Sequence, residues 1–177
     1  MKVITINGCA GAGKDEFVKQ FKEISLLPVL NFSSVDCIKK IAYDLGWDGT
    51  KTPKNRDFLA NLKYLMSEWN DLPMEDLHEK LLEAAAEYGD NFIMFVHVRE
   101  PDEIERIKQE WDALTICIRR PDVEKAILGP STQITNTADL GVFDYIYDLY
   151  VWNDADVQNL REGAVCVYKY LEDKNFQ

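Results

Sequence analysis

Short apolar runs rich in β-branched residues alternate along the chain with longer segments in which apolar residues recur every three or four positions. Such runs are typical of strands buried on both faces, and the recurring pattern is typical of amphipathic helices. The expected strands cover residues 3–6, 28–32, 92–98, 114–118 and 145–152, and the expected helices cover residues 16–24, 33–45, 56–69, 73–88, 102–111 and 156–171. We therefore predict an α/β fold of three layers, α/β/α, around a mostly parallel five-stranded sheet.

Length and composition limit the kind of protein this can be. The chain has 177 residues and a formal net charge of −11. From this length we expect one domain over residues 1–177. Its negative charge is expected to repel long nucleic acids and anionic membranes. The four cysteines lack the spacing of a metal site and are expected to be reduced, as in a cytoplasmic protein. We expect neither a signal peptide nor a membrane-spanning helix, because no apolar stretch is long enough.

A glycine-rich segment joins the first expected strand to the first expected helix. Its sequence, Gly8-Cys9-Ala10-Gly11-Ala12-Gly13-Lys14-Asp15, fits the GxxxxGK pattern of a phosphate-binding loop, or P-loop. Glycines let the backbone curl so that successive N–H groups face phosphate oxygens, and the lysine reaches the β- and γ-phosphates. We predict a P-loop NTPase fold that binds ATP through seven of these residues: Gly8, Ala10, Gly11, Ala12, Gly13, Lys14 and Asp15.

Asp15 occupies the place where this pattern usually has Ser or Thr. A carboxylate beside phosphates is repulsive unless a cation lies between them, so Asp15 is a candidate Mg²⁺ ligand. An acidic residue in the first turn of a helix is also favoured by the helix dipole alone. The sequence leaves both interpretations open.

From this loop onward the sequence resembles the deoxynucleoside monophosphate kinases of phages and bacteria. Their loop commonly ends in Gly-Lys-Asp, an ending shared by animal-type phosphomevalonate kinase. Residues 32–39, Phe-Ser-Ser-Val-Asp-Cys-Ile-Lys, resemble the family's Phe-Ala-Asp-Pro-Leu-Lys, and residues 97–103, His-Val-Arg-Glu-Pro-Asp-Glu, resemble its Asp-Val-Arg-Phe-Pro-Asn-Glu. Residues 56–59, Arg-Asp-Phe-Leu, resemble its Gly-Arg-x-Leu-Leu, and residues 153–154 resemble the Asn-Asp after its last strand. The resemblance implies phosphoryl transfer from ATP, with Mg²⁺, to a (deoxy)nucleoside monophosphate.

The resemblance also implies an acceptor side formed by a helical insertion over residues 34–90. The expected acceptor-binding residues are Asp36, Lys39, Arg56, Lys63 and Arg99. For Arg56 and Lys63, which are seven residues apart on one expected helix, a solvated helix face is an equal alternative. For Arg99, at the end of an expected strand, a structural salt bridge is the alternative.

A lid is expected over residues 120–144. Arg99 and Arg120 would act with Lys14 and Asp15 on the transferring group, whereas Arg119 and Asn153 would contact the donor nucleotide. Surface ion pairs with neighbouring carboxylates, Asp122 or Glu124, are the alternative for the two lid arginines.

Two departures from the family pattern keep other functions open. His97 stands where the family has a strand-end aspartate that helps to hold Mg²⁺, and Lys125 is the only basic residue between Pro121 and Tyr145. A kinase for another phosphorylated metabolite, such as phosphomevalonate, is one alternative. A nucleotide-binding protein without transfer activity is another. We expect small nucleotides as partners, and the sequence leaves open whether the chain forms a homodimer.

Overall fold

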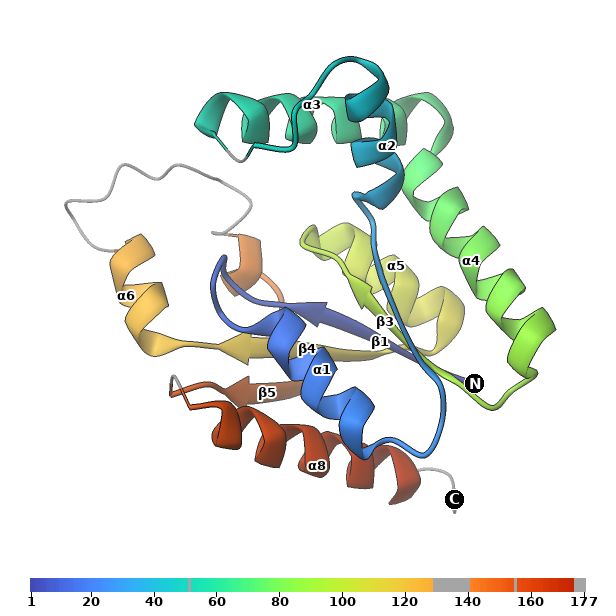
Figure 1. Cartoon of the computed structure of the whole chain (residues 1–177), viewed down its shortest axis with the longest axis vertical. Coiled ribbons are helices and arrows are strands. Elements are labelled where there is room, and N and C mark those ends of the chain that lie inside the picture. The colour runs from blue at the N-terminus through green and yellow to red at the C-terminus, as the bar shows by residue number, and fades with distance from the viewer. Residues whose placement is uncertain (51, 129–140, 155, 174–177) are drawn as a thin grey trace.

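Helices cover both faces of a single sheet in the computed structural model of the chain (Figure 1), which describes residues 1–50, 52–128, 141–154 and 156–173. The strands are β1 (Lys2–Asn7), β2 (Val29–Ser33), β3 (Ile93–His97), β4 (Leu114–Arg119) and β5 (Leu149–Trp152). The helices are α1 (Lys14–Ile24), α2 (Asp36–Asp44), α3 (Pro53–Asn70), α4 (Leu72–Tyr88), α5 (Pro101–Trp111), α6 (Pro121–Leu128) and α8 (Val157–Asp173), with a 3₁₀ turn, η1 (Gly141–Phe143). Every expected strand and helix is present.

The sheet has the strand order β2-β3-β1-β4-β5, and each neighbouring pair is parallel. The three-layer α/β/α prediction is therefore confirmed, with all five strands parallel. Because parallel strands point the same way, their carboxyl ends meet at one edge of the sheet, where ligands bind in folds of this class. Asn7, Ser33, His97 and Arg119 end four of these strands.

Successive side chains of a strand point to opposite faces of the sheet, so alternate residues of the central strands lie in two separate hydrophobic cores. Ile4 and Ile6 of β1 pack with Phe17 and Phe21 under α1 and α8, whereas Val3 faces the core beneath α4 and α5. The buried aromatic rings of Phe21 and Phe95 meet edge to face, with centroids 5.0 Å apart. Burial on both faces explains the continuous apolar runs that predicted these strands.

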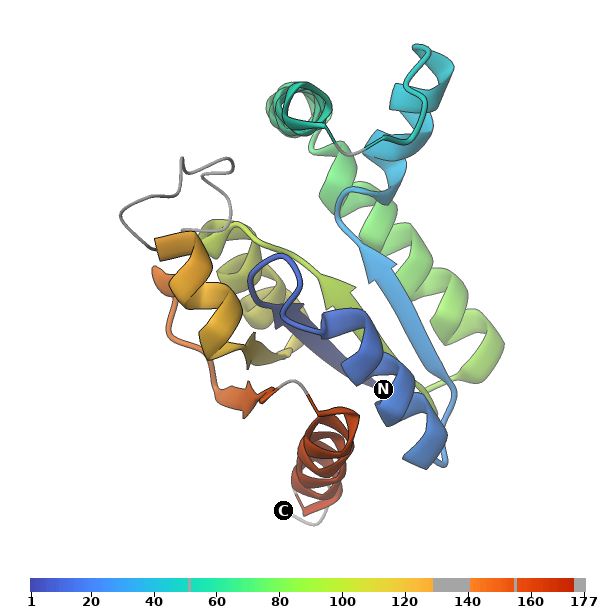
Figure 2. The same cartoon turned by 60° about the vertical axis from the view of Figure 1, so that its left-hand side comes forward.

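The α2 and α3 helices project beyond the carboxyl ends of the strands (Figures 1 and 2). Leu62 of α3 packs in a small core with Cys37 and Ile38 of α2. The spacing of apolar residues in this helix groups Phe58, Leu65 and Trp69 on one side with Leu62, but these three are not buried. They are 36%, 57% and 81% exposed, because α3 is rotated so that its polar residue Lys63 points inward instead.

The expected lid lies only partly in the described structure. Residues 121–128 form the helix α6, which the sequence did not predict, and residues 129–140 lie outside the described residues. No helix in the described part of the chain is both long enough and apolar enough to cross a bilayer.

Candidate active site

The P-loop connects the end of β1 to the start of α1 at the centre of the sheet. Gly8, Gly11 and Gly13 have φ angles of 145°, 80° and 102°, which other residues rarely adopt. A Cβ atom at Gly8 would lie 2.5 Å from the carbonyl oxygen of Ile118, and one at Gly13 would lie 2.6 Å from the side-chain amide of Asn153. The loop therefore needs glycine for its backbone conformation and for its close packing.

The amino end of α1 is built to receive an anion. No side chain caps its first turn, and Gly13 stands at the N-cap position. Helix-terminal N–H groups carry partial positive charge and bind phosphate well. Lys14 lies at the same point, with its ammonium group donating hydrogen bonds to the carbonyl oxygens of Gly8 and, at 3.1 Å, Cys9. The lysine charge is thus held against the loop.

Buried amides support the loop from behind. The side-chain oxygen of Asn7 accepts a 2.8 Å hydrogen bond from the N–H of Gly8, while its amide nitrogen donates to Tyr147 at 2.7 Å. Asn153 donates to the carbonyl of Ala12 at 2.7 Å and is only 4% exposed. Asn153, expected at the donor nucleotide, here contacts the loop itself. Sequence analysis missed Asn7, although a polar residue ending the first apolar strand is a recognisable feature.

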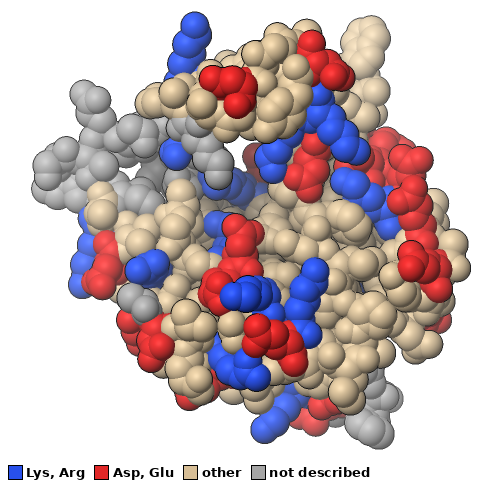
Figure 3. All heavy atoms as spheres, viewed as in Figure 1, with Lys and Arg blue, Asp and Glu red and all other residues tan. Residues whose placement is uncertain are grey.

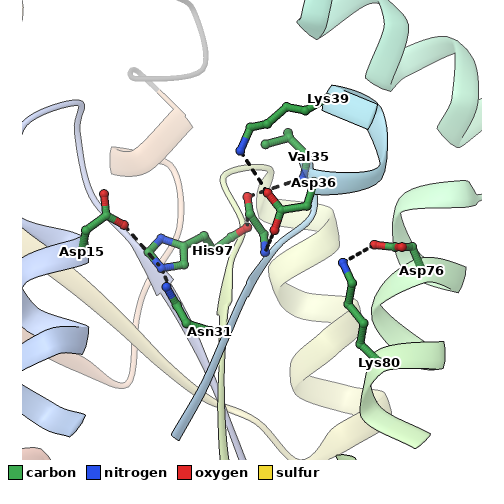
Figure 4. A network of polar contacts seen from close by, with 9 residues as sticks. Asp15, Asn31, Val35, Asp36, Lys39, Asp76, Lys80 and His97 are labelled. Atoms are coloured by element: carbon green, nitrogen blue, oxygen red, sulfur yellow. Dashed lines mark hydrogen bonds and ion pairs between the residues drawn. The ribbon is translucent and has the colours of Figure 1, made fainter. Parts of the chain in front are cut away.

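Asp15 and His97 face each other beside the loop (Figure 4). The Asp15 carboxylate is 97% exposed and lies 3.9 Å from Nε2 of His97. The same nitrogen is 2.8 Å from the side-chain oxygen of Asn31, which can only accept, so Nε2 carries a proton and donates it. Burial lowers the pKa of His97 to about 4, although the negative charge of Asp15 opposes this shift. The imidazole is therefore neutral at pH 7.

This burial predicts an acid-sensitive contribution to stability. The unfolded chain takes up a proton near pH 6.5, the ordinary pKa of histidine, whereas folded His97 does so only near pH 4. Stability is therefore retained above pH 6.5 and lost as the pH falls to 4, by up to about 3 kcal/mol. Urea unfolding across this range should show a smaller acid loss in His97→Gln than in the parent. Parallel pH profiles for the two proteins would contradict the assignment.

The start of α2 forms the second polar group of the site, with Asp36 and Lys39 paired to each other. One oxygen of Asp36 accepts from the N–H of Ser33 at 2.8 Å, and the other accepts from the Lys39 ammonium at 2.9 Å (Figure 4). Both residues follow β2 closely and therefore lie at the carboxyl edge of the sheet.

Lys63 bridges α3 to the start of α5. It is only 5% exposed, and its ammonium group donates to the carboxylates of Glu100 and, at 2.8 Å, Glu103. Burial raises the pKa of Glu103, as does the charge of Glu100. Burial opposes ionisation of Glu100 too, but the charge and hydrogen bond of Lys63 hold its pKa below the usual value. Two of the three donors of its ammonium group are therefore held by carboxylates, which leaves at most one for an acceptor phosphate.

Arg56 lies near the start of α3, and Arg99 lies two residues after the end of β3. Seven residues separate Arg56 from Lys63, so both project from the same side of α3, the side that faces α5. Arg56 is exposed, and Arg99 is partly buried at the end of β3, where its carbonyl oxygen accepts from Asn7 at 3.3 Å. Figure 3 shows this face of the molecule hollowed below the α2–α3 layer, with basic side chains in view inside the hollow.

The two lid arginines have different surroundings. Both guanidinium contacts of Arg119 with Glu124 are 2.7 Å long, and its guanidinium carbon lies 5.2 Å from the Phe143 ring and 5.5 Å from the Trp152 ring. Arg120 reaches over the P-loop and donates to the carbonyl of Gly11 at 3.1 Å. Its buried Nε has no hydrogen-bond partner among the described residues. Arg119 thus forms the ion pair considered for it, whereas Arg120 is the arginine that touches the loop.

These residues fit a bound triphosphate and Mg²⁺. The uncapped helix end and Lys14 suit the phosphates, and a carboxylate at Asp15 suits a cation bridging to them, since Mg²⁺ is commonly held by one or two carboxylates plus phosphate oxygens. Within the described residues no three His, Cys, Asp or Glu side chains are grouped to hold a metal by themselves. Asp15 would hold Mg²⁺ together with phosphate oxygens of the nucleotide.

Comparison with solved structures supports the same fold. The chain is similar to shikimate kinase from Aquifex aeolicus, at 11% identity and a TM-score of 0.53, over 96% of this chain and 98% of that one. It is also similar to a sugar kinase from Janibacter sp. HTCC2649 (13%, TM-score 0.51, 94% and 93% covered) and to shikimate kinase from Bacteroides thetaiotaomicron (17%, 0.50, 97% and 98%). No family model matches the sequence, and no curated protein matches it. The chain thus has the fold of P-loop kinases.

Proposed function

We propose that the chain is a phosphotransferase that moves the γ-phosphoryl group of ATP to a (deoxy)nucleoside monophosphate. The observation that carries this proposal is a P-loop at the carboxyl edge of the sheet, with Arg120 bonded to its Gly11 carbonyl and the Asp36–Lys39 pair at the same edge. The sequence resemblance around residues 32–39 and 97–103 favours a nucleotide as the acceptor. The fold by itself favours only a kinase.

The proposed reaction joins two substrates in line. A phosphate oxygen of the acceptor attacks the γ-phosphorus of ATP, and the bond from that phosphorus to the bridging oxygen of the β-phosphate breaks. ADP and a nucleoside diphosphate are the products. The acceptor oxygen is already a nucleophile, so the protein contributes positioning and charge stabilisation.

Each residue of the site has a role in this proposal. Lys14 and the loop N–H groups hold the β- and γ-phosphates, and Arg120 covers the loop near the transferring group. Mg²⁺, held through Asp15, would neutralise the phosphate charge. Across the hollow, the acceptor would be bound by Asp36, Lys39, Arg56 and Arg99.

A second candidate function is nucleotide binding without transfer. The observation that favours it is His97, a neutral side chain at the strand end where the resembled family has an aspartate. A kinase for another phosphorylated metabolite is the third candidate, because a P-loop recognises the donor and not the acceptor.

One acceptor screen separates these candidates. The protein would be incubated with ATP and Mg²⁺ and each ribo- and deoxyribonucleoside monophosphate, or with phosphomevalonate, and products would be separated by ion-exchange chromatography. We expect a nucleoside diphosphate from at least one monophosphate, and none from Lys14→Ala prepared identically. Phosphorylation of phosphomevalonate alone would favour the metabolite kinase. ATP binding with no product from any acceptor would favour the inactive binder.

The role of Asp15 predicts a metal-dependent effect. Asp15→Ala should weaken binding of ATP with Mg²⁺ more than binding of ATP without it, whereas loss of a helix-capping acid would cost only about 1 kcal/mol of stability. Calorimetric titration with and without Mg²⁺ measures both affinities. Glu16→Ala, which removes the other acid of the same turn, is the control. Equal losses in both titrations would remove Asp15 from the metal site.

Arg56 and Arg99 are expected to serve the acceptor and not ATP. Replacing either by Ala should raise the acceptor KM or lower kcat by about tenfold or more, because a charge-assisted phosphate contact contributes about 1.5 to 3 kcal/mol. Lys should rescue only partly, since it lacks the bidentate fork of arginine. Steady-state kinetics and direct ATP titration measure these effects. Arg161→Ala, on α8 and paired with Glu23, is a control that should leave both unchanged. Lost ATP affinity would move an arginine to the donor side.

A further inference from the structure

The outer side of α3 carries three large apolar residues that the chain does not cover. Phe58, Leu65 and Trp69, which we name the α3 stripe, are spaced so that all three lie within about 40° around the helix axis. Their exposed fractions are 36%, 57% and 81%. Phe58 and Trp69 are eleven residues apart, so the stripe is about 16 Å long. A continuous apolar stripe of this kind is typical of a contact surface.

The stripe cannot be buried by a small rotation of α3 within the monomer. The neighbouring side of the helix is already occupied, with Leu62 packed on α2 and Lys63 bonded to Glu100 and Glu103. Turning the stripe inward would expose Leu62 and break both ion pairs. Figure 2 shows α3 end-on, at the outside of its layer. Within the described residues, α3 therefore keeps the stripe on its exposed side, where another molecule could cover it.

The charges on α3 favour a second copy of this chain. The whole protein has a net charge of −11, but α3 contains three basic and two acidic residues and is therefore net positive. Lys54 and Glu68 are both exposed, lie on one side of the stripe 14 residues apart, and form no ion pair with another described residue. Two α3 helices packed antiparallel bring the Lys54 end of one to the Glu68 end of the other, twice. The charges beside the α3 stripe are thus complementary between two antiparallel copies. Because α3 is net positive in an acidic protein, the repulsion between two copies is also weaker there than elsewhere on the surface.

We infer that the chain forms a symmetric homodimer in which the α3 stripes of two copies pack against each other antiparallel. The contact is isologous, so each copy provides the same residues. Trp69 is the principal anchor, since buried tryptophans contribute most to such interfaces. The contact leaves the Arg56 side of α3 open, so both hollows stay accessible to substrates.

Sedimentation velocity tests the surface directly. The parent should sediment as a dimer at micromolar concentration, and Leu65→Glu and Trp69→Glu should each sediment as monomers. Both residues are exposed, so thermal unfolding monitored by circular dichroism should show that the variants remain folded. Leu82→Glu removes an equally exposed leucine from α4 and should leave the dimer intact. A monomeric parent, or a dimer that survives both stripe variants, would overturn the inference.

Charge reversal tests the antiparallel arrangement. Lys54→Glu alone and Glu68→Lys alone each create two like-charge contacts and should raise the dimer dissociation constant by at least about tenfold. The double variant Lys54→Glu/Glu68→Lys exchanges the charges and should restore dimerisation towards the parent level. In a parallel pair, Lys54 would lie beside Lys54 of the other copy, and Glu68 beside Glu68. Reversing either charge would replace one like-charge contact by another, so the repulsion would not change. Single reversals without effect would therefore contradict the antiparallel dimer.

Discussion

Replacing Lys14 by alanine should lower ATP turnover by at least about a hundredfold, because the ammonium group neutralises the β- and γ-phosphates in ground and transition states. The fold should persist, since the hydrogen bonds of Lys14 to the carbonyl oxygens of Gly8 and Cys9 lie within the loop and Lys14 is not part of the buried core. Steady-state kinetics on the active acceptor and calorimetric titration of ATP measure the two effects.

The matched control for Lys14 lies on the same helix. Lys19 is 65% exposed and pairs with Glu16 at 3.6 Å, away from the loop. Lys19→Ala should keep parent turnover and ATP affinity. If Lys14→Ala also binds and turns over ATP like the parent, the P-loop assignment is wrong. That result would refute every function proposed above while leaving the dimer inference untouched.

Replacing Lys63 by methionine should destabilise the fold by about 3 kcal/mol, since it leaves the carboxylates of Glu100 and Glu103 without their cation. The effect should lie at the lower end for a buried pair, because Glu100 is 45% exposed. Urea unfolding measures the loss. The triple variant Lys63→Met/Glu100→Gln/Glu103→Gln should recover much of it, because no buried charge then remains.

The Lys63 variant should also change how stability depends on pH. Without the ammonium group, the folded-state pKa of Glu103, already raised from the ordinary 4.5, should rise further. A folded carboxyl with a raised pKa keeps its proton longer than the unfolded chain does, so the penalty is largest at high pH and shrinks towards pH 4.5. Lys108→Met, which breaks the more exposed pair with Asp148, should cost less than about 1 kcal/mol. A similar cost for both variants would show that Lys63 acts as a surface lysine.

The succession of strands and helices along the chain and the position of the P-loop could be predicted from the amino-acid sequence. Short apolar runs such as residues 93–96 and 114–118 predicted strands buried on both faces, and the structure confirms them. The glycines of the P-loop permit the positive φ angles that such a loop requires. These features depend on residues close together in the sequence, so local pattern was sufficient.

The packed faces of the helices and the contacts between distant side chains could not be predicted from the sequence and became known from the three-dimensional structure. The spacing of apolar residues groups Phe58, Leu62, Leu65 and Trp69 on one side of α3. It does not show which side of the helix packs against the protein, and the buried side is the one that carries Leu62 and Lys63. The partners of Lys63 are 37 and 40 residues away, and Asn153 reaches the P-loop across 141 positions. Such contacts depend on how whole elements are stacked, because the chain between them imposes no spacing that sequence alone reveals.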